Sequence, residues 1–182
     1  PIRFDAEIEL HRTGAFDMKF DGYLAKVELY KALKDRKIGP VEERKQIDYI
    51  KTDFGRDPSV KEFKYFKQGH FKVNWERNGD LIKARSVSFF NASEFFLGIR
   101  YNSKTRRITM SGKSLTNNAK KKLDQLGLGW TGQIRVFTDA KVISHNATGV
   151  KKNKRLGGRY MTYTWVVENI FAPTPSLIIQ IL

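Results

Sequence analysis

Three side chains in the first half of the sequence offer the components of a metal-dependent nuclease. Asp53 is followed by the Glu-x-Lys pair formed by Glu62 and Lys64. In such sites carboxylates hold Mg²⁺ and a lysine orients the attacking water. The motif is typical of a strand, whereas the apolar residues within 60–66 follow a helical spacing. Asp53, Glu62 and Lys64 are therefore catalytic candidates only if the protein is a Mg²⁺-dependent nuclease.

A second group, Gly112-Lys113-Ser114, resembles the end of a phosphate-binding loop. It lies between a predicted strand and a predicted helix. The full loop needs a glycine five residues before Gly112, where Arg107 stands. Nucleotide hydrolysis is therefore not expected. Two interpretations stay open: the helix start and Lys113 hold one phosphate, or a serine or threonine simply caps the helix.

Other catalytic and metal chemistries lack their residues. The chain of 182 residues contains no cysteine, which excludes disulfides, thiolate catalysis and thiolate-bound metals. Its three histidines, His11, His70 and His145, are too few for a histidine-rich metal site. We therefore expect no cofactor and no metal, and a protein that is more readily a binder than an enzyme.

Positive charge is concentrated in the second half of the sequence. The whole chain has 34 Lys and Arg against 19 Asp and Glu, a net charge of +15. Residues 95–182 contain 15 of the basic side chains but only 3 acidic ones, so this half carries +12. Surfaces that serve solubility alone mix both signs. The asymmetry predicts a polyanionic partner.

The basic residues of this half are the candidate nucleic-acid-binding residues. Lysine and arginine track a phosphodiester backbone, and aromatic rings between them stack on unpaired bases. Trp130 and Tyr160 are rings expected to be exposed among these charges. The basic candidates are Arg100, Arg106, Arg107, Lys113, Lys120, Lys121, Lys122, Arg135, Lys151, Lys152, Lys154, Arg155 and Arg159.

The spacing of apolar residues predicts the elements that must position these groups. Alternation predicts a strand over 2–10, and helical spacing from Asp21 predicts helices up to residue 68. Alternation returns at His70, and Asn78-Gly79 predicts a hairpin turn. Later segments are predicted as a hairpin of strands at 95–101 and 105–110, a helix near 115–126, and strands at 133–137, 159–167 and 177–181.

These elements predict an α+β fold: a mostly antiparallel β-sheet, an N-terminal helical segment at about 21–68, and a short helix near 115–126. We expect one domain over residues 1–182. A sub-boundary near residue 69 is left open, and residues 144–158 are expected to form a mobile basic loop.

The leading functional hypothesis is a non-enzymatic protein that binds single-stranded DNA or RNA through a basic, aromatic-containing face in residues 95–182. The first alternative is a capsid or genome-packaging protein of a virus or phage, because a shell subunit would also keep one basic side against nucleic acid. The second alternative is the Mg²⁺-dependent nuclease. The choice between DNA and RNA stays open.

Partners and location follow from the same observations. Nucleic acid is the expected partner, with single strands favoured. No apolar run approaches the roughly 20 residues of a membrane span, so no membrane partner is expected. A homo-oligomer through the apolar C-terminal strand is left open. We expect the protein to be intracellular, cytoplasmic or nucleoid-associated, or to be part of a virion, and not to be secreted.

Overall fold

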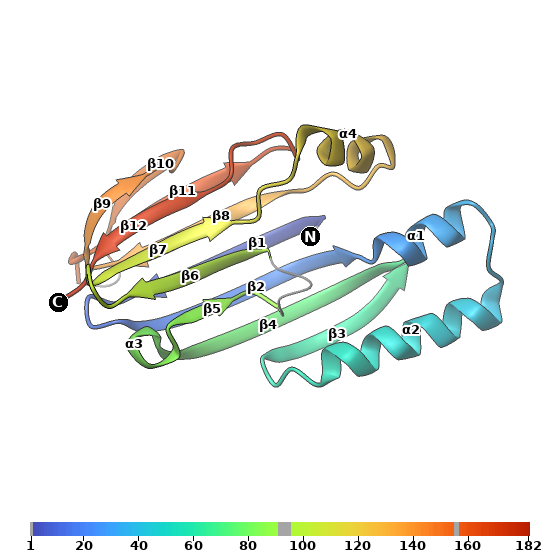
Figure 1. Cartoon of the computed structure of the whole chain (residues 1–182), viewed down its shortest axis with the longest axis horizontal. Helices are drawn as coiled ribbons and strands as arrows, with labels where there is room; N and C mark the ends of the chain where they lie inside the picture. Colours follow the sequence, from blue (N-terminus) through green and yellow to red (C-terminus); the bar gives the residue numbers. More distant parts are fainter. Residues whose placement is uncertain (1, 91–95, 155–156) are drawn as a thin grey trace.

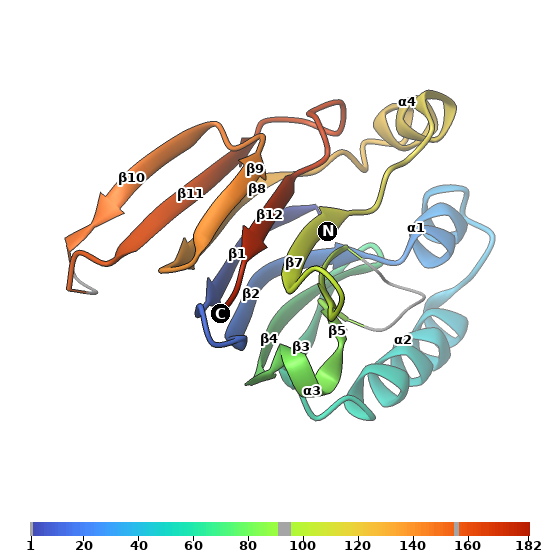
Figure 2. The ribbon, with the colours of Figure 1, turned by 60° about the vertical axis from the view of Figure 1, so that its left-hand side comes forward.

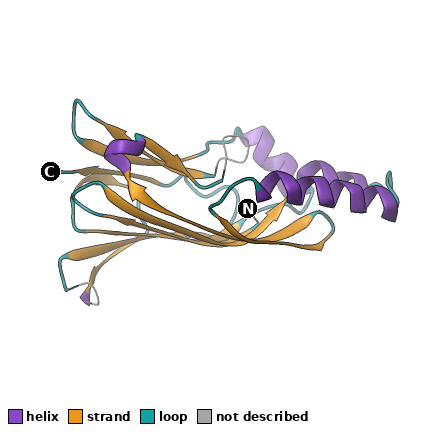
Figure 3. Cartoon of the chain, turned by 90° about the horizontal axis from the view of Figure 1, so that it is seen from below, coloured by secondary structure: helices purple, strands orange, loops and turns teal. Residues whose placement is uncertain are grey.

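Alternating apolar residues build two β-sheets that lie face to face, and the chain begins with a strand (Figure 3). The structure is a computed structural model that describes residues 2–90, 96–154 and 157–182. The seven-stranded sheet has the order β10-β11-β8-β1-β2-β4-β3. Its strands are β1 (Arg3–Leu10), β2 (Ala15–Ala25), β3 (Val60–Lys67), β4 (His70–Asp80), β8 (Thr131–Thr138), β10 (Gly149–Asn153) and β11 (Tyr160–Val167).

The second sheet has five strands in the order β5-β6-β7-β12-β9. They are β5 (Ser86–Ser88), β6 (Leu97–Asn102), β7 (Arg107–Gly112), β9 (Lys141–His145) and β12 (Ser176–Gln180). All its pairings are antiparallel, whereas the seven-stranded sheet contains one parallel pair, β1 with β8. β12 pairs on both sides, with β7 and β9, so the C-terminal strand is not the unpaired edge on which a homo-oligomer would depend.

Helices occupy the two ends of this sandwich. α1 (Val27–Lys34), α2 (Pro40–Gly55) and α4 (Asn117–Gln125) gather at one end, and the short α3 (Leu81–Ala84) lies at the other (Figures 1 and 2). Within the described part of the chain, no helix has both the length and the apolar character needed to cross a membrane.

The core lies between the two inner faces. β1 and β2 alternate buried and accessible residues along their length, as expected of strands with one apolar face. Aromatic rings extend the core beneath α2, where Phe54 stacks on Phe63 with 4.3 Å between ring centroids and Phe63 stacks on Phe71 at 4.8 Å. α2 therefore covers the part of the inner face that belongs to β3 and β4.

The predicted fold class is wrong, because the predicted helical segment 21–68 begins and ends with strands. Residues 15–25 form β2, whose alternation of Phe16, Met18, Phe20 and Leu24 is a strand pattern that continues past Asp21. The first helix begins only at residue 27. The protein is mostly β-structure in two sheets, with helices inserted between strands.

The far end of the predicted helical segment is wrong for a different reason. β3 contains two shifts of register against β4, after Val60 and after Tyr65, and such bulges break the two-residue period. The resulting spacing imitates a helix. Just before β3, Asp57 accepts hydrogen bonds from the Ser59 amide (2.9 Å) and from Trp75 Nε1 (3.0 Å).

The predicted hairpin turn at Asn78-Gly79 is also wrong. Both residues lie within β4 and pair with β2, Asn78 opposite Asp17 and Gly79 opposite Phe16. A Cβ at Gly79 would lie 3.2 Å from the Phe16 ring, so the glycine makes room for that ring rather than for a turn.

Other predicted elements are confirmed with small changes in their ends. The strand at 2–10 is β1, the second hairpin is β6 and β7, and the helix near 115–126 is α4. The strands predicted at 133–137, 159–167 and 177–181 are β8, β11 and β12. Residue 69 lies in the turn between the paired strands β3 and β4, and the basic loop expected at 144–158 includes β10; residues 155–156 of that loop lie outside the described residues.

We expect Trp75→Ala to lower the free energy of unfolding by about 3–5 kcal/mol, because it removes a fully buried ring and leaves a cavity. The Trp75 side chain is 1% exposed, and the change also removes its bond to Asp57. Tyr49→Ala is the control, since Tyr49 is 74% exposed and its loss should cost less than about 0.5 kcal/mol. Urea denaturation measures both, and equal midpoints would contradict the burial of the Trp75 ring.

We expect Gly132→Ala to destabilise the fold by about 1–3 kcal/mol through overpacking. A Cβ at Gly132 would lie 2.2 Å from the Phe4 carbonyl oxygen, so the strands would have to move apart. Gly149→Ala is the matched strand control, because its Cβ meets nothing within 4 Å. Thermal melts of the two variants should differ clearly, and a Gly132→Ala protein as stable as the control would rule out this close approach.

Candidate functional site

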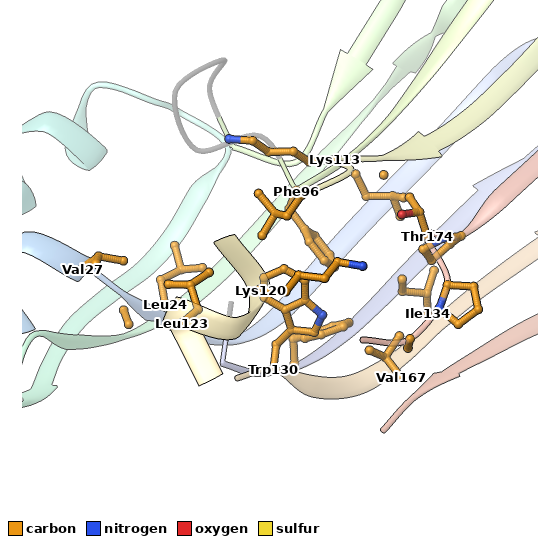
Figure 4. Close-up of a pocket in the computed structure, with 18 residues that line it drawn as sticks. Leu24, Val27, Phe96, Lys113, Lys120, Leu123, Trp130, Ile134, Val167 and Thr174 are labelled. Atoms are coloured by element: carbon orange, nitrogen blue, oxygen red, sulfur yellow. The ribbon is translucent and has the colours of Figure 1, made fainter. Parts of the chain in front are cut away.

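A pocket opens between the two sheets at the end where α1 and α4 lie (Figure 4). Its volume is about 260 Å³. The inner faces of both sheets, the start of α1, one side of α4 and residues 172–175 between β11 and β12 contribute to its lining. Elements that are far apart in the sequence therefore meet around one cavity.

The floor of the pocket is apolar and rigid. Phe4, Leu24, Ile134 and Val167 come from four neighbouring strands of the seven-stranded sheet, and Leu97 comes from β6 of the other sheet. All five side chains are buried against the core. A ligand that reaches this floor exchanges water for apolar contact, which is favourable without any directional bond.

Two glycines allow β1 to approach its neighbours beneath this floor. Gly22 on β2 and Gly132 on β8 both lie opposite Phe4 in the strand register. A Cβ on either glycine would come within 2.9 Å of a Phe4 side-chain atom, besides overlapping backbone of β1. Phe96 meets the Phe4 ring edge-on, with 4.8 Å between centroids. The glycines thus make the space that the Phe4 ring occupies at the base of the pocket.

α4 forms a wall that is only partly packed. Thr116 caps the helix by accepting a hydrogen bond from the Ala119 amide (3.2 Å). Leu123, on the side of α4 that lines the pocket, is only half-buried, and no residue of α4 is fully buried. The Tyr30 hydroxyl donates to the Leu126 carbonyl (2.7 Å) and ties the end of α4 to α1. The apolar side of α4 therefore faces space rather than a filled core.

The polar side-chain atoms of the lining are mostly donors. Lys113 and Lys120 are its charged residues among those described, and neither ammonium has an ion pair or hydrogen bond with another described residue. In Figure 4 the Lys120 ammonium lies among the other lining side chains, whereas that of Lys113 lies at their edge. Trp130 Nε1 has no described acceptor, although Trp75 and Trp165 donate to Asp57 and Asn146.

This arrangement can bind but offers no acid–base pair for catalysis. No aspartate, glutamate or histidine is among the described residues that line the pocket. Apolar walls with free ammonium and indole N–H donors favour a molecule that is apolar at one end and anionic at the other.

The structure brings three of the predicted site residues, Lys113, Lys120 and Trp130, to this pocket. Lys121 and Lys122 lie beside them on α4 and are exposed. The phosphate-loop resemblance does not extend to the geometry, because α4 begins at Asn117 and its cap is Thr116. The helix is therefore capped by a threonine, as the second interpretation expects.

The other predicted basic residues lie on two different sheets. Those of the seven-stranded sheet share one groove, which Arg135, Lys151, Lys152 and Lys154 line together with the carboxylates of Glu7, Glu9 and Asp17. Arg100, Arg106 and Arg107 belong to the β6–β7 hairpin of the five-stranded sheet, and Arg107 Nε donates to Gln180 Oε1 at 3.4 Å. Arg135 lies on the outer face of the seven-stranded sheet, 2.9 Å from an Asp5 oxygen and 2.6 Å from a Glu7 oxygen. Its charge is neutralised by these carboxylates.

The densest basic run lies along one edge of the seven-stranded sheet. Lys151 and Lys152 lie on β10, an edge strand, and Lys154 follows it. Lysines on an edge oppose pairing with a second chain. Arg155 lies outside the described residues, and Arg159 is exposed just before β11.

Tyr160 is not a free stacking ring. Its hydroxyl forms a hydrogen bond with His11 Nδ1, and the His11 ring packs edge-on against it at 5.6 Å between centroids. Partial burial raises the pKa of the Tyr160 phenol, and the carboxylates of Asp139 and Glu9 raise it further. The neighbouring rings of Tyr163 and Trp165 are buried.

The nuclease residues do not assemble either. Glu62 and Lys64 lie on a strand, as the motif requires, but they pair with each other at 3.6 Å. Asp53 lies on α2, 3.9 Å from Arg56. The part of the chain that the structure describes contains no group of three or more acidic, histidine or cysteine side chains that could hold a metal ion.

Sequence reasoning missed the pocket because its apolar residues are also typical core residues. Leu115 and Leu123, which line the pocket, are in the sequence indistinguishable from leucines that face a filled core. The sequence does not show that this side of α4 faces an unfilled cavity, because the cavity depends on how strands that are distant in the sequence pack together.

Comparisons with known proteins give little further guidance. No family model and no curated protein matches the chain. Among solved structures, the chain is similar to the folded domain of the LppM protein of Mycobacterium tuberculosis, determined by NMR. The TM-score is 0.49 and the identity 11%, over 99% of this chain and 90% of that one.

The predictions of a nucleic-acid-binding protein, a viral or phage structural protein and a Mg²⁺-dependent nuclease are wrong. The described basic residues do not form one cationic face, because those of the β6–β7 hairpin belong to the other sheet and the groove of Arg135 and the β10 lysines also holds carboxylates. Of the two predicted rings, Tyr160 is hydrogen-bonded to His11 and Trp130 lies half-buried in the pocket. The nuclease residues lie apart. Of the predicted site residues, the candidate site retains only those that line the pocket.

Proposed function

We propose that this protein binds a small amphiphile, an apolar chain with an anionic head group, in the pocket between its sheets. The observation that carries the proposal is the pairing of an apolar floor with two unpaired lysines, Lys113 and Lys120, as the charged groups of the described lining. An anionic head group would supply the missing partner of the lysines, and its chain would cover the floor.

Size and charge narrow the ligand class. A volume of about 260 Å³ lies just below the roughly 300–1,000 Å³ of sites for drug-sized ligands, so a single chain fits better than a two-chain lipid. Each methylene removed from water contributes about 0.8 kcal/mol, so the chain supplies most of the affinity. Lys120 is half-buried, and its ion pair with the head group would be less screened than one on the open surface.

Dodecanoate tests the charge requirement directly. We expect Lys120→Glu to weaken dodecanoate binding at least tenfold, or about 1.4 kcal/mol, because an attraction becomes a repulsion. Lys121→Glu is the matched control: it makes the same charge change one residue away, on an exposed side chain outside the pocket. The affinity for dodecanol, which has no charge, should differ far less between the two variants.

Trp130 provides the readout for this titration. Trp75 and Trp165 are buried, whereas Trp130 is half-buried in the pocket, so ligand-dependent fluorescence should disappear in Trp130→Phe. Failure of dodecanoate to bind, or equal weakening by the two lysine variants, would exclude the proposed site.

A second variant tests the cavity itself. Ala172→Trp places a large ring on a half-buried loop residue that lines the pocket, and we expect it to abolish binding of dodecanoate and dodecanol alike. Phe171→Trp adds an indole at the neighbouring exposed position, outside the lining, and should bind normally. Calorimetry is the measurement, because both variants alter tryptophan fluorescence. Undiminished binding by Ala172→Trp would place the ligand elsewhere.

A further inference from the structure

Exposed basic and apolar residues form a rim at the end of the molecule where the pocket opens. The rim consists of Lys113, Lys121 and Lys122 together with Lys34, Val27 and Phe171. The side chains of Val27 and Phe171 are 37% and 47% exposed, large fractions for apolar residues. These residues come from α1, α4 and the segments next to them, the elements that gather at one end of the molecule (Figures 1 and 2).

The lysines of the rim outnumber the acids beside them, although Asp124 shares the side of α4 on which Lys121 lies. At 100° per residue, Lys121 lies on the side of α4 opposite Leu123, which lines the pocket. Lys34 Nζ lies 5.8 Å from the centroid of the Tyr30 ring, whose hydroxyl contacts the end of α4. Lys113, Lys121 and Lys122 have no ion pair with any described residue. The acids of α1, α4 and the 168–175 segment are Glu28, Asp124 and Glu168, and Asp35, which follows α1, lies 3.9 Å from Lys37.

We infer that this rim docks the protein on an anionic lipid bilayer, so that the pocket exchanges its amphiphile with the membrane surface. The inference rests on the proposed function, because a single-chain amphiphile partitions into bilayers. The lysines would lie among anionic head groups, and Val27 and Phe171 would enter the boundary between head groups and chains.

The composition of the rim favours a lipid surface over a protein or a nucleic acid. Its cations are all lysines, flexible point charges that suit a diffuse layer of head groups. Protein interfaces are depleted in lysine and enriched in arginine. The exposed apolar side chains of Val27 and Phe171 suit the boundary between head groups and acyl chains, which a nucleic acid does not offer. The expectation of no membrane partner depended on the lack of a spanning segment, which does not bear on docking at the surface.

Vesicle sedimentation tests the inference. We expect the protein to bind vesicles of phosphatidylcholine with phosphatidylglycerol and to bind pure phosphatidylcholine vesicles much less. Each lysine near such a surface is worth about fivefold, so Lys121→Gln with Lys122→Gln should weaken binding about thirtyfold. Lys151→Gln with Lys152→Gln is the control, because it removes the same charge from β10, far from α4 in both views (Figures 1 and 2).

These experiments test the binding of an amphiphile and the docking on a membrane independently. Lys121 and Lys122 do not line the pocket, so their double variant should bind dodecanoate from solution as the unaltered protein does. Absence of a preference for anionic vesicles, or equal weakening by the two double variants, would overturn the docking inference, and an acidic protein partner would then be the better occupant of the rim. Vesicle binding without dodecanoate binding would instead remove the pocket function and the exchange with the membrane.

Discussion

The close approach of β1 to its two neighbours is the constraint on which the site depends. β1 is the centre of the seven-stranded sheet and pairs with β2 on one side and, in parallel, with β8 on the other. At the level of Phe4 both neighbours have glycine, and any side chain there would overlap β1. The same glycines leave no Cβ on the inner face beside Phe4. Close backbone packing and an open pocket therefore have one cause.

The distribution of charge follows from the architecture rather than from one ligand. Arg135 lies over the strand that carries Asp5 and Glu7, so acids of the first half neutralise a base of the second half. Lysines on β10 protect an edge, and arginines of the β6–β7 hairpin belong to the other sheet. A charge count along the sequence separates these residues from their carboxylate partners, because Asp5 and Arg135 are 130 residues apart. Among the described residues, the lysines around α4 lie near a pocket whose lining contains no carboxylate, whereas the groove of Arg135 and the β10 lysines also holds Glu7, Glu9 and Asp17.

The sequence predicted individual elements where the pattern was local. β1, the β6–β7 hairpin, α4 and the last strands were recoverable because each shows regular alternation or helical spacing within its own residues. β3 was not, because its two bulges change the period, and the partner strand that tolerates them is invisible in the sequence. The turn predicted at Asn78-Gly79 was wrong for a similar reason. A glycine beside an asparagine is typical of a turn, but Gly79 accommodates the Phe16 ring of another strand. For the site, Lys113, Lys120 and Trp130 were identified for the wrong ligand, since residue type alone does not distinguish a surface groove from a pocket.

The pocket also affects the stability of the fold. If a cavity of about 260 Å³ were sealed and empty, it would cost about 6 kcal/mol at roughly 24 cal/mol per Å³. That is comparable with the whole stability of a typical domain, about 5–15 kcal/mol. α4 avoids this cost by remaining half-packed, with Leu123 in contact with the pocket and the helix held at its end by the Tyr30 bond. A ligand that filled the space would complete the packing of α4, so binding and the ordering of this helix should be coupled. The apolar side of α4 faces the pocket and its exposed lysines face solvent. Ligand binding in the pocket and docking on a lipid surface would therefore both involve this helix.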